Sequence, residues 1–166
     1  QTGITSLVSV SSFGIQGNNS SSEPVMTPDG RYIAFISYAT NLVPADTNGG
    51  IGDVFMHDMQ TGITSLISVD SNSNGGNGGS DTSFSLSISS DGHFVTFGSD
   101  ASNLVPNDNN GVTDVFIHDM ETGDTSIVSV DSSGLQGNRE SPSSSISADG
   151  RFVTFYSAAT NLVQSD

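Results

Sequence analysis

The residues best suited to chemistry in this sequence are carboxylates and amides in two short, glycine-containing stretches. In residues 108–114, Asp108, Asn110 and Asp114 occupy the first, third and seventh positions, and Val112 offers a backbone carbonyl at the fifth. Calcium takes about six to eight oxygen ligands, and this spacing resembles the first half of calcium-binding loops. The sequence therefore predicts a calcium site in this stretch.

A second copy of the stretch, residues 46–53, is one residue longer and supplies Asp46, Asn48 and Asp53. Its carbonyl ligand cannot be assigned from spacing, and a third copy reaches only Asp166. The alternative for every copy is a metal-free turn, because Asp and Asn side chains hydrogen-bond to the backbone of turns. Calcium binding and a metal-free turn both stay open on the sequence alone.

Two further acids follow these stretches but are not expected to join the site. Asp119 is the twelfth residue counted from Asp108, and Asp58 is its counterpart after the first stretch. The intervening residues read as a β-strand, which extends by about 3.3 Å per residue and therefore carries the acid roughly 16 Å away. Asp58 and Asp119 are predicted to cap turns.

The chain repeats itself with a period of about sixty residues. A segment that begins Thr-Gly and ends Ser-Val occurs three times, at residues 2–10, 61–69 and 122–130. An Asp-Gly pair followed by an aromatic strand also occurs three times, and its aspartates, Asp29, Asp91 and Asp149, are spaced 62 and then 58 positions apart. We divide the chain into a single repeat domain, 1–166, with units 1–59, 60–120 and 121–166, the last of them incomplete.

Each unit contains short β-prone segments separated by turn residues, and no window shows helical periodicity. One set of four expected strands is residues 84–89, 94–97 and 114–118 of the second unit followed by residues 125–130 of the third, with a tight hairpin at Asp91-Gly92. The sequence predicts an all-β protein made of four-stranded antiparallel sheets repeated in tandem, which is typical of β-propeller blades.

The motifs of the repeat resemble a known family. Residues 149–155 (Asp-Gly-Arg-Phe-Val-Thr-Phe), 103–106 (Asn-Leu-Val-Pro), 108–111 (Asp-Asn-Asn-Gly) and 114–119 (Asp-Val-Phe-Ile-His-Asp) are similar to TolB-like, WD-repeat-related propeller repeats of secreted and cell-surface bacterial proteins. The resemblance covers nearly the whole chain. It implies a propeller fold and an extracellular or cell-surface location, and it implies no reaction.

The expected strands do not add up to whole blades. Reading from Gln1, eleven strands give two complete blades and partial blades at both ends, and the end strands lack a third strand between them. Three blades would also be fewer than the usual four or more. We expect part of a larger propeller or a multi-chain assembly, in which open edges pair with further blades of a longer chain or with other copies.

The amino-acid composition excludes several classes of binding partner. The chain has 166 residues, a formal net charge of −15, three basic side chains and no cysteine. This charge disfavours nucleic acid and anionic membrane surfaces, and no apolar run is long enough for membrane insertion. The absence of cysteine removes disulfides and thiol chemistry. The chain starts at Gln1 without a leader pattern, so a mature or excised segment is expected.

Other residues with chemical potential have simpler interpretations. His57 and His118 occupy equivalent strand positions and are predicted to be packed, hydrogen-bonded histidines. Three residues follow the Asp-Gly pairs in register and could form a partly cationic, anion-binding ring at a channel mouth, although such residues more often only cover the turn: Arg31, His93 and Arg151.

The aromatic residues divide into two groups. Those on the second and third strands of each unit are predicted to form core between blades: Tyr32, Phe35, Phe55, Phe94, Phe97, Phe116, Phe152 and Phe155. Phe13, Tyr38 and Tyr156 lie nearer loops and are the candidates for stacking against a glycan.

No catalytic constellation stands out, because the sequence lacks a thiol, a nucleophile elbow, a zinc-protease helix motif and a phosphate loop. The sequence therefore favours a non-catalytic, calcium-stabilised propeller module that serves scaffolding or self-association, with filament formation as one outcome. One alternative is a lectin-like module that binds glycan. Another is the accessory propeller of a larger hydrolase.

Overall fold

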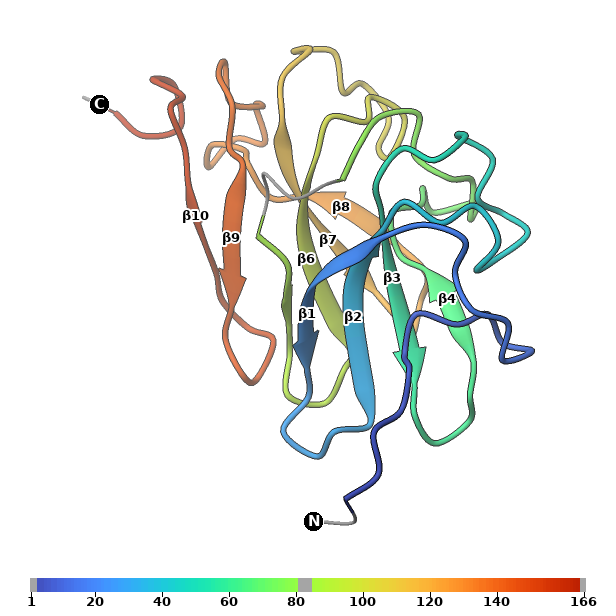
Figure 1. The fold of residues 1–166 in the computed structure, drawn as a ribbon. Coiled ribbons are helices and arrows are strands. Elements are labelled where there is room, and N and C mark those ends of the chain that lie inside the picture. The colour runs from blue at the N-terminus through green and yellow to red at the C-terminus, as the bar shows by residue number, and fades with distance from the viewer. Residues whose placement is uncertain (1–2, 81–84, 165–166) are drawn as a thin grey trace.

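The computed structural model describes residues 3–80 and 85–164, and in these residues it contains ten β-strands and no helix. The strands form three antiparallel sheets that lie beside one another, with loops gathered at one end and hairpin turns at the other (Figure 1). Within the described residues, no helix is present that could cross a membrane.

Two of the sheets are complete four-stranded blades in which neighbours along the chain pair with each other. The first blade consists of β1 (Ser21–Met26), β2 (Tyr32–Ser37), β3 (Asp53–Asp58) and β4 (Thr64–Leu66). The second consists of β5 (Ser87–Ile88), β6 (Phe94–Ser99), β7 (Asp114–Asp119) and β8 (Thr125–Ile127). Each blade therefore takes its first three strands from one sequence unit and its fourth strand from the next.

The third sheet has two strands, β9 (Ser143–Ile146) and β10 (Val153–Tyr156), which correspond to the first and second strands of a blade. The sheet is joined to the second blade through serine side chains. Ser85 Oγ lies 2.8 Å from Ser143 Oγ and accepts the backbone N–H of Ser144 at 2.7 Å. The predicted two complete blades are confirmed, as is the partial blade at the C-terminal end, whereas the partial blade expected at the N-terminal end has no strand in residues 3–9.

Three strand predictions were wrong in detail. An expected strand ends at Val10, but the described residues 3–9 before it are irregular, and none of the described strands pairs with them. The fourth strand was expected to reach Val130, but β8 ends at Ile127 because the chain turns back and Val130 bridges to Gln136. The strand expected at residues 84–89 is shorter, with β5 covering Ser87–Ile88, and Phe84 lies outside the described residues.

The Asp-Gly hairpins are positioned by a side chain before the turn and by close packing after it. Ser89 Oγ donates to Asp91 Oδ1 at 2.6 Å, and Asp91 accepts the backbone N–H of His93 at 3.0 Å. Gly92 has a φ of 76°, and a Cβ there would lie 2.3 Å from the ring of Tyr32 in the preceding blade. Glycine is therefore required both for the backbone conformation and for blade-to-blade contact.

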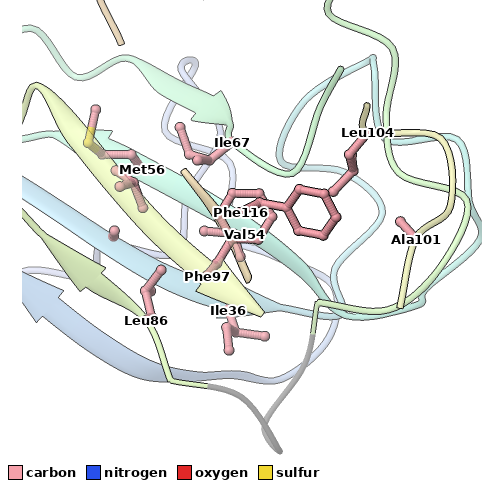
Figure 2. Close-up of a cluster of buried hydrophobic side chains, with 11 residues drawn as sticks. Ile36, Val54, Met56, Ile67, Leu86, Phe97, Ala101, Leu104 and Phe116 are labelled. Carbon is pink, nitrogen blue, oxygen red and sulfur yellow. The ribbon is translucent and has the colours of Figure 1, made fainter. Parts of the chain in front are cut away.

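The largest buried cluster fills the space between the first and second blades (Figure 2). Phe97 and Phe116 stack at a centroid distance of 5.9 Å at its centre. The buried members come from both blades, and they are Ala34, Ile36, Val54, Met56, Ile67, Leu86, Val95, Phe97, Ala101, Leu104 and Phe116. Phe35 and Phe55 form the same stack one blade earlier, also at 5.9 Å.

Candidate functional site

The two predicted ligand stretches form the loops that connect β2 to β3 and β6 to β7, and each ends in a buried aspartate. Asp53 accepts hydrogen bonds from Ser68 Oγ and from Asn48 Nδ2, both at 2.7 Å. Asp114 has the same pair of donors, Ser129 Oγ at 2.5 Å and Asn110 Nδ2 at 2.7 Å. Neutral side chains therefore satisfy both oxygens of each buried carboxylate.

Burial makes these carboxylates hard to ionise. It raises the pKa of Asp53 to about 6, against the hydrogen bonds from Ser68 and Asn48, which lower it. Burial likewise raises the pKa of Asp114 and that of Asp108, and for Asp108 the negative charge of Asp114 adds to the effect. The two acids of each loop are thus close enough to disfavour each other's ionisation, a cost that a bound cation would remove.

The two loops differ in the oxygens that remain available. In the first loop, Asp46 Oδ1 and Asn48 Oδ1 are buried and accept no hydrogen bond. In the second loop, Asp108 Oδ1 accepts a long bond of 3.4 Å from Gln136, and Asn110 Oδ1 accepts the backbone N–H of Val112 at 3.2 Å. Spacing favoured the second loop as the clearer calcium site, whereas the free acceptor oxygens lie in the first.

The donor set of the first loop suits a hard cation. Carboxylate and amide oxygens are calcium ligands, and two buried oxygens without a donor are unusual in a folded protein. In residues 3–80 and 85–164, however, no three His, Cys, Asp or Glu side chains gather closely enough to hold a metal ion together. Any cation here would depend on amide and carbonyl oxygens as well as on Asp46 and Asp53.

The candidate cationic ring is largely neutralised inside each blade. Arg31 forms an ion pair with Asp58 at 3.0 Å, and His93 Nε2 lies 2.9 Å from Asp119 Oδ1. Asp58 also accepts the backbone N–H of Gln60 at 2.8 Å, and Asp119 accepts that of Glu121 at 2.8 Å. The two acids therefore cap turns, as predicted, and they also bind the side chains of Arg31 and His93, a pairing that sequence spacing did not indicate.

Arg151, the third member, is exposed, and its guanidinium lies 5.4 Å from the ring centroid of Phe152. The equivalent Arg31 lies over Tyr32 at 4.6 Å in the same manner. The residue that would match Asp58 and Asp119 belongs to a third strand, and the β9–β10 sheet has only two. Arg151 makes no ion pair with the acids of the described residues.

The strand histidines are structural, as predicted. His57 Nδ1 lies 2.8 Å from Thr64 Oγ1, and that hydroxyl donates to the carbonyl of Val10 at 2.5 Å. His118 and Thr125 repeat the arrangement at 2.9 Å, with Thr125 donating to the carbonyl of Val69 at 2.5 Å. Each threonine hydroxyl has one hydrogen, which it donates to a backbone carbonyl. The hydroxyl therefore accepts the bond from the histidine, and each histidine donates from Nδ1. Burial lowers the pKa of both histidines.

In all three units one asparagine side chain joins two loops, a contact that we call the asparagine clasp. This contact was not predicted from the sequence. Asn41 accepts the backbone N–H of Asn18 at 2.9 Å and donates to the carbonyl of Gln16 at 2.9 Å. The same bonds join Asn103 to the residue 77 loop and Asn161 to the residue 138 loop. The signal in the sequence is the motif Asn-Leu-Val, which occurs three times, at residues 41–43, 103–105 and 161–163.

The glycine-rich loop at residues 71–79 is held in place by hydrogen bonds to side chains. Asp70 Oδ1 accepts the backbone N–H groups of Asn72 and Asn74, each at 2.8 Å. Asn77 then joins the loop to Asn103 and Ser102. Hydrogen bonds to side-chain oxygens therefore fix the backbone of this loop, which its glycines alone would leave unrestricted.

The aromatic residues predicted to form core are buried where the first and second blades meet, but not in the two-stranded β9–β10 sheet. Phe35, Phe55, Phe97 and Phe116 are buried, whereas Phe152, also predicted to be core, is 63% exposed. Tyr156, expected near a loop, is the last residue of β10 and is 64% exposed. Phe13 is 89% exposed and borders a hollow of about 370 Å³.

A second, more polar cleft of about 580 Å³ lies where the second blade meets the β9–β10 sheet. Its lining includes Asp100, Thr113, Arg139 and Glu140, and Thr113 Oγ1 donates to Asp100 at 2.5 Å. The corresponding positions of the preceding repeat carry Tyr38, Gly52, Gly78 and Gly79. The two gaps between neighbouring sheets are therefore built from different residues.

The open side of β10 distinguishes the third sheet from the two complete blades. Ala34 and Ile36 of β2 and Thr96 of β6 are buried against the sheet that follows. The residues of β10 at these positions, Thr154 and Tyr156, are exposed, and β10 pairs only with β9 among the described strands. The third sheet thus presents both an unpaired edge and an uncovered face.

Comparison with known proteins supports this architecture at the level of fold. No protein-family model matches the chain, and a search of curated proteins found no match. Among solved structures, the β-propeller domain of the Trilobed protease from Pyrococcus furiosus matches with a TM-score of 0.51 and 16% identity, over 82% of this chain and 34% of that one.

Two other matched structures are TolB from Acinetobacter baumannii, with a TM-score of 0.43, 16% identity and coverage of 86% of this chain and 39% of that one, and a putative TolB from Agrobacterium tumefaciens, with 0.41, 18%, 83% and 43%. Of these three structures, the Pyrococcus domain has the highest TM-score, and we base the comparison of folds on it. Its likeness, together with the repeated four-stranded sheets, confirms the predicted β-propeller fold. The chain spans about a third of that domain's length.

Proposed function

We propose that this chain is a non-catalytic β-propeller module of a secreted or cell-surface protein that serves as a scaffold and self-associates through its open end. The observation that carries the proposal is the uncovered face of β10. Thr154 and Tyr156 occupy positions that are buried between blades elsewhere in the chain, so this face has the geometry of a blade interface, which either a second copy or further blades of a longer chain would cover.

The opposite end of the chain offers a complementary surface. The outer face of the first blade bears Phe35 and Ile33 beside Leu7 and Val8, around an apolar hollow of about 190 Å³. A contact between this face and the β10 face of a second copy would be heterologous, since the two surfaces differ. Such contacts give closed rings or open filaments, depending on whether the rotation closes.

The non-catalytic part of the proposal rests on how the reactive side chains are used. His57 and His118 are bound to threonines inside strands, and Arg31 and His93 are bound to carboxylates. The calcium part rests on Asp46 and Asn48, whose buried oxygens lack donors. Calcium bound there would stabilise the loops and offset part of the net charge of −15.

Light scattering coupled to size exclusion tests the proposal, measured from low to high protein concentration with calcium and with a chelator. We expect association that increases with concentration and weakens in Tyr156→Asp, which places a charge on the β10 face. Gln60→Asp is the matched control, because Gln60 is exposed and lies on the turn between β3 and β4, outside that face. A compact monomer at every concentration, with or without calcium, would rule out self-association.

A glycan-binding role is the second candidate, favoured by the exposed ring of Phe13. Phe13 borders a hollow that Ile15, Thr40 and Asn41 also line, so a sugar face could stack there beside polar groups. A glycan array probed with the protein and with Phe13→Ala tests it. Loss of a reproducible glycan signal in the variant supports the role, and an array without signal contradicts it.

A further inference from the structure

We propose that a hollow between the first and second blades binds a soft monovalent cation, Cu(I), through the imidazole of His93 and the thioethers of Met56 and Met120. The hollow has a volume of about 300 Å³ and lies at the end of the blades where the hairpin turns are found (Figure 1). Besides these three residues, Tyr32 and Glu121 line it. The inference is independent of the proposed scaffold function and of the calcium loops.

The surroundings of His93 are those of a metal-binding imidazole. Its Nε2 lies 2.9 Å from Asp119 Oδ1 and 3.5 Å from Glu121 Oε2. Because an ionised carboxylate only accepts hydrogen bonds, the neutral ring carries its proton on Nε2 and has a lone pair on Nδ1. None of the described residues forms a hydrogen bond with this Nδ1. Metal-binding histidines almost always donate their other ring N–H in this way, to a carboxylate, a carbonyl or water.

Two methionines reach the same hollow from different blades. Met56 belongs to β3 of the first blade and is buried in the cluster between the blades (Figure 2). Met120 follows β7 of the second blade directly, and it is half-buried against the same cluster. Thioethers are soft ligands that select Cu(I) over hard divalent cations. Since a methionine side chain has three rotatable bonds, both sulfurs can adjust to an ion in the hollow.

The other copies of the repeat do not carry this set of ligands. The position of Met56 in the first blade is occupied by Ile117 in the second. The hairpin position of His93 is occupied by Arg31 in the first blade and by Arg151 in the third sheet. The repeat therefore folds without methionine or histidine at these two positions, and one gap between blades combines them.

The acids beside the hollow favour a cation without supplying its ligands. Asp119 accepts the ring N–H of His93, and Asp91 accepts the hydroxyl of Ser89 at 2.6 Å. In the part of the chain that the structure describes, no three His, Cys, Asp or Glu side chains are grouped to hold a metal ion. The carboxylates therefore act by attracting positive charge, and the ion is bound by one nitrogen and two sulfurs.

Competition with a chromogenic Cu(I) chelator, in ascorbate and without oxygen, measures the affinity of the intact chain. We expect one Cu(I) for each chain. His93→Arg introduces the residue of the other two hairpins and can keep the ion pair with Asp119, as Arg31 does with Asp58. It should weaken binding by more than about 100-fold, because loss of a residue that only supports a ligand already costs about 10–100-fold. Met56→Ile, which introduces the residue of the second blade, should weaken binding in the same direction.

Ag(I), which shares the ligand preference of Cu(I) and is stable in air, locates the site by NMR of the methionine methyl groups. The methyl signals of Met56 and Met120 should shift. Those of Met26 and Met59, which are 67% and 42% exposed, should not, although they are the more accessible thioethers. Met59→Leu is the matched control, because Met59 stands in the first blade where Met120 stands in the second, beside Arg31 instead of a histidine. Its affinity for Cu(I) should equal that of the wild type.

Denaturant unfolding without metal should show that His93→Arg and Met56→Ile are folded, so that a lost affinity reports on the site. If either variant is unfolded, the Ag(I)-induced methyl shifts of the wild type decide the question alone. Unchanged Cu(I) affinity in both folded variants overturns the proposal. Ag(I)-induced shifts at Met26 and Met59 instead of Met56 and Met120 also overturn it, since they would show binding to exposed thioethers only.

Discussion

The backbone N–H of Asn77 donates to the side-chain oxygen of Asn103 at 2.8 Å, and the amide of Asn103 donates to the carbonyl of Gly75 at 3.0 Å. One side chain thus fastens a glycine-rich loop to the loop that follows β6. Equivalent bonds at Asn41 and Asn161 show that the clasp belongs to the repeat rather than to one blade.

Replacing the clasp residue should loosen the loop before it unfolds the protein. We expect Asn103→Ala to lower the free energy of unfolding by about 1–2 kcal/mol, since two hydrogen bonds of ordinary strength are lost. Hydrogen exchange at residues 70–79 should accelerate more than exchange in β6. Asn109→Ala, a nearby exposed asparagine, is the control, and equal acceleration in both variants would contradict the clasp.

Truncation in the cluster between blades should be the most damaging single change. Phe116 is fully buried against the first blade, and Phe116→Ala should cost about 3–5 kcal/mol, because a cavity remains that the rigid sheets cannot close. Denaturant unfolding measures the loss. Phe13→Ala, at a site that is 89% exposed, should change stability by less than about 0.5 kcal/mol.

Calcium should stabilise the protein mainly through the first loop. The buried, donor-free oxygens belong to Asp46 and Asn48, so Asp46→Asn should reduce the calcium-dependent shift in Tm more than Asp108→Asn does. At a calcium concentration of about one hundred times Kd, the stabilisation of a single site is about 2.7 kcal/mol. An unchanged melting curve on addition of a chelator would favour metal-free turns.

The stability of the metal-free protein should carry a signature of Asp53 between pH 4 and pH 7. Burial raises the pKa of Asp53 to about 6, so the folded state retains a proton that the unfolded state has lost. The stability from this group is complete below about pH 4 and is lost as pH rises through 6.

Comparison with Asp53→Asn isolates this effect from the buried histidines, whose lowered pKa values act in the opposite direction over the same range. From pH 4 to pH 7 the wild type should lose about 3 kcal/mol relative to the variant, following the shift in pKa. Urea titrations with a chelator present measure it. A difference that is constant with pH would show that Asp53 ionises normally.

The sequence predicted most of the fold because each blade depends on local rules. Asp91-Gly92 and the strand at residues 94–97 identify a hairpin and a buried strand without any long-range information. The failures occur where pairing with a distant segment decides the outcome. Residues 3–9 have the composition of a strand and are irregular, because a strand needs a neighbour to pair with.

The hydrogen-bond partners of the candidate ligand residues could not be predicted from the sequence. Asp46, Asn48 and Asp53 were identified from spacing, yet Ser68, which satisfies Asp53, lies on another segment and could not be paired with it by inspection. Arg31 and Asp58 are likewise separated in sequence and were assigned independent roles, although they form one ion pair. Contacts between strands require the register, which the sequence alone did not supply.

The bonds from Thr64 to Val10 and from Thr125 to Val69 determine how a mechanical load would pass through the chain. Each bond ties the outer strand of one blade to the end of the preceding segment, so neighbouring blades are connected at the rim as well as through their core. Pulling on the two termini would load these rim bonds one after another. Under force the module should therefore yield in discrete steps, one for each blade.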